Sequence, residues 1–190
     1  MQNHFYAMMS RMKNIYRWGL MRNTKPENLS EHSLEVAFVA HALAIINNTR
    51  LGGSIDPAKV AVAAMYHDTT EIITGDMPTP IKYYNCDIKK VYKDIEKVAE
   101  NRLLEKLPDD FLEIFSKIYN PDADTARLVK AADKISALIK CIEEANMGNR
   151  EFAVAEQSTR DAITALNCPE ADIFMAEFME SFSLSLDELN

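Results

Sequence analysis

The sequence predicts an all-α protein. The 190-residue chain contains only five glycines and seven prolines, too few for the many turns of a β protein. Its ten methionines, together with frequent Ala, Leu, Glu and Lys, favour helix. Several segments repeat apolar residues at intervals of three and four, the period of one helical face. With 47% hydrophobic residues, this length suits a single globular domain with a sizeable core, spanning residues 1–190.

Charge and cysteine content exclude several classes of partner and of structural site. A net charge of -8 argues against a nucleic-acid polymer as partner, because such binding depends on Lys and Arg that neutralise phosphates. Three cysteines without a Cys-x-x-Cys pair indicate neither a disulfide framework nor a thiolate zinc site, and they fit a reducing cytoplasm. No apolar run approaches the roughly 20 residues of a membrane span and no signal-peptide core is present, so we expect no membrane association.

The first helix is expected at about residues 3–17. Its apolar stripe consists of Phe5, Met8, Met9, Met12, Ile15 and Tyr16. Gly19 ends this helix, which places Arg17 and Trp18 at its exit. Residues 1–26 carry five basic residues and no acid, so this end of the chain either receives a small anion or forms a solvated helix face. Taken alone, the single tryptophan is more typical of a core residue.

A second helix is expected from about residue 29 to 47, because Asn28-Leu29-Ser30-Glu31 offers N-caps followed by a first-turn acid. His32 lies in its first turn. His41 follows nine residues later, half a turn around the helix and roughly 13 Å along it, so the two histidines cannot share a site. We therefore assign His41 to packing or to the surface.

A third helix is expected over about residues 57–75, because Asp56-Pro57 is an N-cap followed by the favoured first-turn proline. Its apolar run leads into His67, Asp68 and Glu71. A helix turns about 100° per residue, so Glu71 stands one turn past His67 on nearly the same face, with Asp68 at the edge of that face. A buried cluster of one imidazole and two carboxylates must be paired or coordinated, which indicates a metal site.

The remaining helices are expected at about residues 88–103, 109–119, 123–146, 150–166 and 169–182. The loop Gly75-Asp76-Met77-Pro78-Thr79-Pro80 is stiffened by two prolines and can hold Asp76 against a ligand hydroxyl, although an ordinary helix terminator is the plainer interpretation.

Asp133 lies among apolar residues and needs a cation. That cation is Lys130, Lys134 or a metal, and Asp133 alone does not decide between them.

Four residues on three predicted helices, His32, His67, Asp68 and Asp133, follow the order H…HD…D. In this arrangement the sequence resembles the HD-domain metal-dependent phosphohydrolases. Further motifs resemble the bacterial 5'-deoxynucleotidase branch of that family, over nearly the whole chain. They are Arg17-Trp18, Ser30-Glu31-His32-Ser33, Tyr66-His67-Asp68, Glu71, Gly75-Asp76-Met77-Pro78-Thr79-Pro80, Ala132-Asp133 and Ser183-Leu184-Ser185-Leu186-Asp187-Glu188.

The resemblance implies a helical bundle of the HD-domain type that holds a divalent ion with those four side chains. Two imidazoles and two carboxylates suit Mn, Fe, Co, Ni or Zn better than Ca, and they leave positions open for water and substrate. Such an ion would lower the pKa of water and neutralise a phosphate oxygen, so that water attacks phosphorus in line. Only His4 and His41 remain for a second ion. We therefore expect one transition-metal ion per subunit.

The other site residues have roles beyond the ligand set. Glu71, counted with Asp68 as catalytic, is expected to orient the nucleophile or to transfer a proton. The plainer alternative is a surface or salt-bridged helix residue. Arg17 is expected to anchor phosphate, because a guanidinium fork matches phosphate oxygens. The resemblance implies that Trp18, Asp76 and Pro78 shape a pocket that prefers deoxyribose, that Thr79 also binds substrate, and that the protein is a homodimer.

The predicted function is hydrolysis of deoxyribonucleoside 5'-monophosphates to deoxynucleoside and phosphate. A deoxynucleoside triphosphohydrolase or a cyclic-nucleotide phosphodiesterase would use the same metal core, although a triphosphate usually requires more basic groups than the Arg17 region offers. A catalytically silent HD module with a regulatory role is a third alternative. The presence of Glu71 beside the four ligand residues counts against it.

Overall fold

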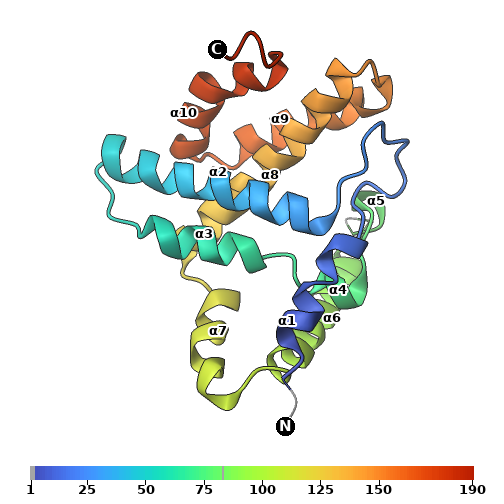
Figure 1. Cartoon of the computed structure of the whole chain (residues 1–190), viewed down its shortest axis with the longest axis vertical. Coiled ribbons are helices and arrows are strands. Elements are labelled where there is room, and N and C mark those ends of the chain that lie inside the picture. Colours follow the sequence, from blue (N-terminus) through green and yellow to red (C-terminus); the bar gives the residue numbers. More distant parts are fainter. Residues whose placement is uncertain (1–2, 83) are drawn as a thin grey trace. The chain divides into compact units, whose positions relative to one another are not determined.

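The computed structural model describes residues 3–82 and 84–190, except for the side chains of Thr79 and Lys82. Within these ranges the chain is helical with no β-strand, so the all-α prediction is confirmed (Figure 1). The α-helices are α1 (Phe5–Met9), α2 (Leu29–Arg50), α3 (Pro57–Tyr66), α4 (Glu71–Thr74), α5 (Thr79–Lys82), α6 (Cys86–Leu104), α7 (Leu112–Tyr119), α8 (Ala123–Asn146), α9 (Ala153–Ala165) and α10 (Pro169–Phe178). Short 3-10 helices are η1 (Met12–Asn14), η2 (Asp109–Phe111), η3 (Arg150–Phe152) and η4 (Met179–Ser183).

The described chain forms two compact units, which we treat separately. The site unit comprises the described residues of Met1–Leu20, Pro26–Ser33 and Tyr66–Pro121. The core unit comprises Met21–Lys25, Leu34–Met65 and Asp122–Asn190. Helix α2 therefore begins in the site unit and continues in the core unit. A single domain over residues 1–190 stays a prediction.

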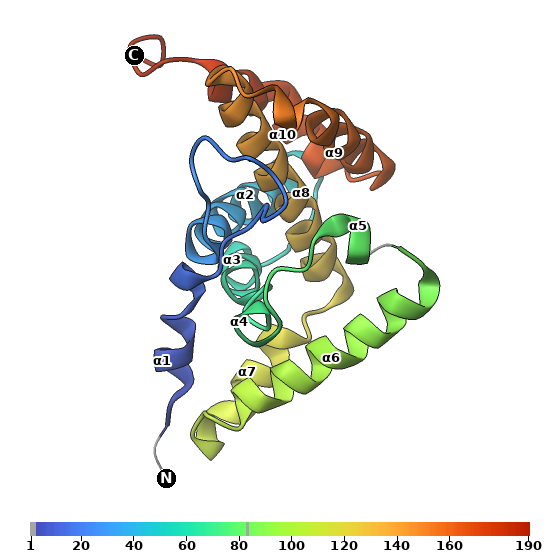
Figure 2. The ribbon, with the colours of Figure 1, turned by 90° about the vertical axis from the view of Figure 1, so that its right-hand side faces the viewer.

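Helix α6 organises the site unit, where α1, α4, α5 and α7 all contact it (Figure 2). Asn85 caps its N-terminus by accepting a hydrogen bond from the backbone N–H of Ile88 at 2.8 Å. A small apolar cluster packs its C-terminal end against α1 and α7, and its buried members are Phe5, Leu103, Leu107 and Phe115. The apolar residues of α6 are only partly buried: Val91, Ile95 and Val98 form a stripe that is exposed.

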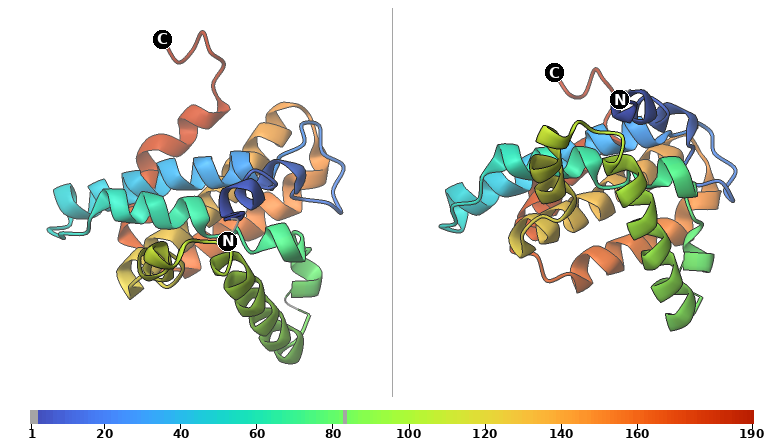
Figure 3. Two further views of the ribbon diagram at one scale, coloured as in Figure 1. Left: turned by 60° about the horizontal axis from the view of Figure 1, so that its bottom comes forward. Right: turned by 90° about the horizontal axis from the view of Figure 1, so that it is seen from below.

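Helix α8 organises the core unit. It packs against α9 and α10 and against the 3-10 helices η3 and η4. Asp122 caps it by accepting from the backbone N–H of Thr125 at 2.9 Å. Leu34–Met65 supplies the other side of this core, and α2 and α3 lie side by side within it (Figures 1 and 3). By length and hydropathy α2 could span a membrane, but 56% of its most apolar window is buried inside the protein. Among the described residues it is thus a core helix.

The first helix was predicted too long. Helix α1 ends at Met9, η1 follows, and Ile15 is extended with φ -100° and ψ 113°. The cause is a pairing that local periodicity does not reveal: Tyr16 forms an isolated antiparallel bridge with Asn28, and the N–H of Arg17 donates to the carbonyl of Glu27 at 3.0 Å. Arg17 and Trp18 therefore lie at the base of a loop and not at a helix exit.

The proline-containing loop also differs from the prediction, because α5 begins at Thr79 within it. Proline is compatible with the first turn of a helix, where its missing N–H would have no intrahelical partner. The carbonyl of Pro78 accepts from the N–H of Ile81 at 2.9 Å and closes that turn.

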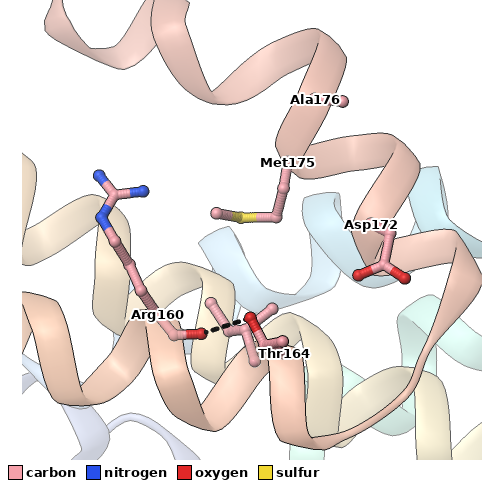
Figure 4. Close-up of a pocket in the computed structure, with 6 residues that line it drawn as sticks. Arg160, Thr164, Asp172, Met175 and Ala176 are labelled. Carbon is pink, nitrogen blue, oxygen red and sulfur yellow. Dashed lines mark hydrogen bonds between the residues drawn. The ribbon is translucent and has the colours of Figure 1, made fainter.

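A surface pocket of about 420 Å³ lies between α9 and α10 in the core unit (Figure 4). Its lining consists of Arg160, Ile163, Thr164, Asp172, Met175 and Ala176. The hydroxyl of Thr164 donates to the carbonyl of Arg160 at 3.1 Å, and the Arg160 guanidinium donates to Glu156 at 2.9 Å. None of the predicted site residues lines this pocket.

Candidate metal centre

His32 is placed by the start of α2. Asn28 Oδ1 accepts from the N–H groups of Ser30 and Glu31 at 3.0 and 3.1 Å, while Glu31 Oε2 accepts from the N–H of Asn28 at 3.1 Å. This reciprocal capping box fixes where the helix begins. His32 consequently lies in the first turn, with none of its side chain exposed. His41 is exposed further along the same helix, as predicted.

His67 and Asp68 lie in a turn and not in a helix, which corrects the predicted continuous helix to Gly75. Helix α3 ends at Tyr66, residues 67–70 form the turn, and α4 runs from Glu71 to Thr74. Buried Thr69 explains the break, because its Oγ1 donates to the Tyr66 carbonyl at 2.8 Å and lies 2.8 Å from the Tyr119 hydroxyl. A side-chain hydroxyl that binds a nearby backbone carbonyl competes with the regular helix.

Three side chains converge in the site unit as a result. Asp68 Oδ2 lies 3.1 Å from His67 Nε2 and 3.5 Å from His32 Nε2. The ligand atoms of these three residues are all within 4.8 Å of one another. Burial alone would raise the pKa of the Asp68 carboxyl, but the charges and hydrogen bonds of His67 and His32 overcome this effect and hold that pKa well below its ordinary value.

The spacing of these atoms fits a transition-metal ion. Ligand nitrogens and oxygens lie about 2.1 Å from such an ion, so neighbouring ligand atoms in a tetrahedral or octahedral shell are about 3.0–3.5 Å apart. The two separations at Asp68 Oδ2, 3.1 and 3.5 Å, match this range. Imidazole nitrogen and carboxylate oxygen also form a donor set suited to Mn, Fe, Co, Ni or Zn. The described residues thus include a cluster with the chemistry and spacing to hold a divalent metal.

Arg17 adds a positive charge to this cluster. Its Nη1 lies 3.4 Å from Asp68 Oδ2, and its Nε donates to Glu27 Oε2 at 3.2 Å. The Arg17 side chain is 12% exposed, so solvent screens its charge only weakly. Trp18 Nε1 donates to the same Glu27 oxygen at 3.0 Å. Arg17 and Trp18 therefore share one carboxylate partner next to the metal-ligand cluster.

Glu71 begins α4 and is 4% exposed. Its backbone N–H donates to the carbonyl of Asp68 at 3.0 Å, and its own carbonyl accepts from the N–H of Gly75 at 2.8 Å. Gly75 ends α4 with φ 75°, a left-handed conformation that glycine adopts without strain. The Glu71 backbone is therefore fixed to the turn that carries Asp68.

The other predicted substrate residues follow α4. Asp76 and Pro78 are partly buried in the segment between α4 and α5, and Thr79 begins α5. The side chain of Thr79 lies outside the described part of the structure. This segment belongs to the site unit, together with His67 and Asp68.

Asp133 belongs to the core unit, on α8. It is partly buried between Ala132 and Lys134, and Lys134 Nζ lies 3.1 Å from its Oδ2. Of the two lysines considered from the sequence, Lys134 is the one that forms this ion pair. The role of Asp133 as a fourth ligand stays a prediction.

Glu27 is the residue of this site that sequence reasoning missed. It carries no motif, and its neighbours in the chain suggest only a polar loop. One signal was available: Glu27 is the first acidic residue of the sequence, after five basic residues. Its side chain is 12% exposed, which is low for a loop glutamate.

Comparisons with known proteins indicate the family to which the chain belongs. A family model described as 5'-deoxynucleotidase YfbR-like matches residues 4–182. A 5'-deoxynucleotidase of Vibrio parahaemolyticus is 48% identical over 192 residues, covering 100% of this chain and 99% of that protein. The 5'-deoxynucleotidase YfbR of Salmonella paratyphi B is 47% identical, covering 100% and 96%.

Solved structures share the fold at lower identity. An HD-domain phosphohydrolase from Listeria innocua has a TM-score of 0.83 and 20% identity, covering 96% of this chain and 90% of that one. The HD phosphohydrolase DatZ of cyanophage S-2L, solved with dA and one catalytic Zn2+ ion, has a TM-score of 0.67 and 19% identity, covering 96% and 98%. These structures indicate the fold, and the full-length matches indicate the family. The chain belongs to the YfbR-like family of 5'-deoxynucleotidases.

Proposed function

We propose that this protein hydrolyses deoxyribonucleoside 5'-monophosphates to deoxynucleoside and phosphate, with a divalent metal as cofactor. The observation that carries the proposal is the convergence of His32, His67 and Asp68, with the Arg17 guanidinium 3.4 Å from the same carboxylate oxygen. A cation site beside a buried guanidinium suits a phosphate ester. Full-length relatives at 47 and 48% identity that are named 5'-deoxynucleotidases support this substrate class.

The proposed ligand set is His32, His67, Asp68 and Asp133, holding one transition-metal ion per subunit. Asp133 is included because the resemblance to the HD-domain phosphohydrolases, with the order H…HD…D, implies an aspartate at this position as the fourth ligand. In the structure Lys134 pairs with this carboxylate, and a bound metal ion would compete with that lysine. Co, Mn, Zn, Ni and Fe all suit this donor set. When bound, such an ion lowers the pKa of water and neutralises phosphate charge.

Arg17 is proposed to bind the substrate phosphate. Its guanidinium presents several N–H donors in a fixed plane, which matches two phosphate oxygens. In the structure one of these groups, Nη1, already lies beside Asp68, the carboxylate at the centre of the cluster. A phosphate bound near the cluster is therefore within reach of Arg17 without a large movement of the loop.

Glu71 is proposed to orient the attacking water or to accept its proton, with Asp68 acting both as ligand and as a catalytic group. The buried position of Glu71 and the hydrogen bond from its N–H to the Asp68 carbonyl support this role, because a general base must be held near the reacting atoms. A mobile surface carboxylate could not be positioned in this way.

Trp18, Asp76, Pro78 and Thr79 are proposed to contact the sugar and to favour deoxyribose. The indole of Trp18 is held by Glu27, which gives the pocket one rigid wall. Asp76 lies in the segment that follows Glu71 directly and can accept a hydrogen bond from a sugar hydroxyl.

The protein is also proposed to be a cytoplasmic homodimer. Its three cysteines are free, which fits a reducing compartment. The exposed apolar stripe of α6, formed by Val91, Ile95 and Val98, is 47–56% accessible in the single chain and supports association with a second copy. Light scattering coupled to size-exclusion chromatography tests this proposal, since a single-chain mass would contradict it.

The experiment for the proposed function measures the release of phosphate and of triphosphate from dAMP, AMP and dATP by metal-supplemented protein. We expect release from dAMP and little from AMP or dATP. Triphosphate release from dATP would indicate a triphosphohydrolase, and no release from any of the three by metal-loaded protein would indicate a regulatory module. Either result would contradict the proposal.

A further inference from the structure

Glu27 contacts three residues to which the proposed function assigns separate tasks. Its Oε2 accepts from Trp18 Nε1 at 3.0 Å and from Arg17 Nε at 3.2 Å. Its Oε1 lies 3.9 Å from His32 Nδ1. Glu27 itself is neither a predicted ligand nor a predicted substrate residue. The carboxylate thus lies between the proposed phosphate, sugar and metal contacts.

The backbone places Glu27 in this position. Arg17 N–H donates to the Glu27 carbonyl at 3.0 Å, next to the bridge between Tyr16 and Asn28. The loop that leaves Arg17 therefore returns at Glu27, directly opposite. Trp18, at the start of the loop, has φ 60°, a left-handed conformation that residues other than glycine rarely adopt. The hydrogen bond from its indole to Glu27 holds the side chain despite this unusual backbone.

The contact between Glu27 and His32 concerns the ring orientation of a proposed metal ligand. A histidine that binds a metal through one ring nitrogen usually presents the other nitrogen to a carboxylate or carbonyl, which fixes the ring orientation. His32 Nε2 faces Asp68 Oδ2 at 3.5 Å, while Nδ1 faces Glu27. The carboxylate of Glu27 is thus on the side of the ring opposite the metal-ligand cluster.

We propose that Glu27 is a positioning residue that fixes Arg17, Trp18 and His32 as one assembly. This inference rests on the proposed function, because it assigns these three residues to the substrate and the metal. Glu27 acts through them and does not touch the reacting atoms. Loss of its charge weakens the hydrogen bonds that the guanidinium and the indole donate to it, and it removes the negative charge beside Nδ1 of His32.

The test compares Glu27→Gln and Glu27→Asp with the control Glu113→Gln. Glu113 is in the same unit on α7, its side chain is 83% exposed, and its ion pair with Lys117 is remote from the roles assigned above. The first readout is fluorescence of the metal-free protein, because Trp18 is the only tryptophan. The second is Mn2+ affinity by calorimetry, and the third is kcat and KM with dAMP.

For Glu27→Gln we expect increased quenching of Trp18 by acrylamide and Mn2+ affinity lower by about tenfold or more. We also expect KM for dAMP to rise by about tenfold, with a smaller fall in kcat, because ground-state binding through Arg17 is lost. Glu27→Asp keeps the charge and should recover part of each effect. Glu113→Gln should match the unchanged protein in all three measurements.

The proposal is overturned if folded Glu27→Gln shows unchanged quenching, Mn2+ affinity and KM. It is also overturned if Glu27→Gln and Glu27→Asp fold and lose activity equally while quenching and affinity stay normal. If the unchanged protein itself releases no phosphate from dAMP, the proposed function fails. The fluorescence and calorimetry then still decide the role of Glu27, because neither depends on turnover.

Discussion

His67 Nε2 lies 3.1 Å from Asp68 Oδ2, although the two residues are adjacent in the sequence. Successive residues of a regular helix project about 100° apart, so an unbroken helix would separate these side chains. The turn after Tyr66 brings them together, and buried Thr69 maintains that turn through its hydroxyl. Thr69, which is not among the proposed metal ligands or substrate residues, therefore helps to determine the shape of this cluster.

Thr69→Val should lower both stability and metal affinity. Valine keeps the volume but removes the hydrogen bonds to the Tyr66 carbonyl and the Tyr119 hydroxyl, so these partly buried groups lose that partner. We expect the free energy of unfolding to fall by about 1–3 kcal/mol. Urea denaturation measures this change. Thr49→Val, which removes a comparable 2.8 Å bond to the Ile45 carbonyl at an exposed position, should cost much less. Equal costs for the two variants would contradict the role of Thr69.

Arg17→Gln should raise KM for dAMP by roughly 10- to 100-fold, because hydrogen bonds to a charged phosphate are lost. Steady-state kinetics measure the effect. Arg22→Gln is the matched control, since Arg22 is a basic residue of the same loop whose side chain is 91% exposed and paired with Glu151. If both substitutions raise KM equally, the N-terminal bases act through general charge and Arg17 has no specific contact with phosphate.

Glu71→Gln should lower kcat by about 100-fold or more while leaving metal binding intact, because general-base assistance contributes roughly 10²–10⁴-fold. The amide keeps the size of the side chain but cannot accept the proton. Phosphate release and Mn2+ calorimetry on the same preparation separate the two effects. Full turnover in this variant would remove the catalytic role, and loss of the metal would make Glu71 a ligand.

The core unit should lose stability in acid because of two buried carboxylates. Burial raises the pKa of Glu144, but Lys140, Asn149 and two backbone N–H groups overcome it and lower that pKa to about 2. Hydrogen bonds from Arg127 similarly lower the pKa of Glu170 to about 2, against the effect of burial. Their stabilisation is present above the ordinary value of 4.5 and is lost as the pH falls towards 2.

Glu144→Gln measures this contribution. The variant should be less stable than the unchanged protein by on the order of 3 kcal/mol at pH 7. The difference should shrink between pH 4.5 and 2, because the unchanged protein then becomes protonated at the same carboxylate. Thermal melting of both proteins across this range checks the prediction. A difference that is independent of pH would show that the charge of Glu144 does not stabilise the fold.

Most of the fold could be predicted because its signals are local. Helix α8 was expected at about residues 123–146 and is observed at Ala123–Asn146, since both a cap at Asp122 and a long apolar stripe mark it. Helix α2 begins where Asn28 caps it. In both cases a side chain within three residues decides the helix start. The signal is therefore contained in one short window of sequence.

The helix predictions were wrong where contacts between residues far apart in the sequence determine the backbone conformation. The predicted α-helix does not continue past Met9 to residue 17, because Tyr16 pairs with Asn28. The turn at 67–70 depends on Thr69, which also contacts Tyr119 fifty residues away. Periodicity contains no information about either contact. The grouping of His32 with His67 and Asp68 could nevertheless be predicted, because these residues and their order resemble the motif of the HD-domain phosphohydrolases. Glu27 has no such signature and became visible only through its three neighbours.

We propose that His32, His67, Asp68 and Asp133 hold one catalytic metal ion per chain. The most direct measurement is titration of chelator-stripped protein with Co2+ while phosphate release from dAMP is followed. We expect no release before metal is added and a linear rise that ends at one ion per chain. Asp133→Asn should abolish the rise, whereas Lys134→Gln, which removes the lysine paired with Asp133, should retain it. Full release by the stripped protein, or saturation at two ions per chain, would contradict a site with one catalytic ion.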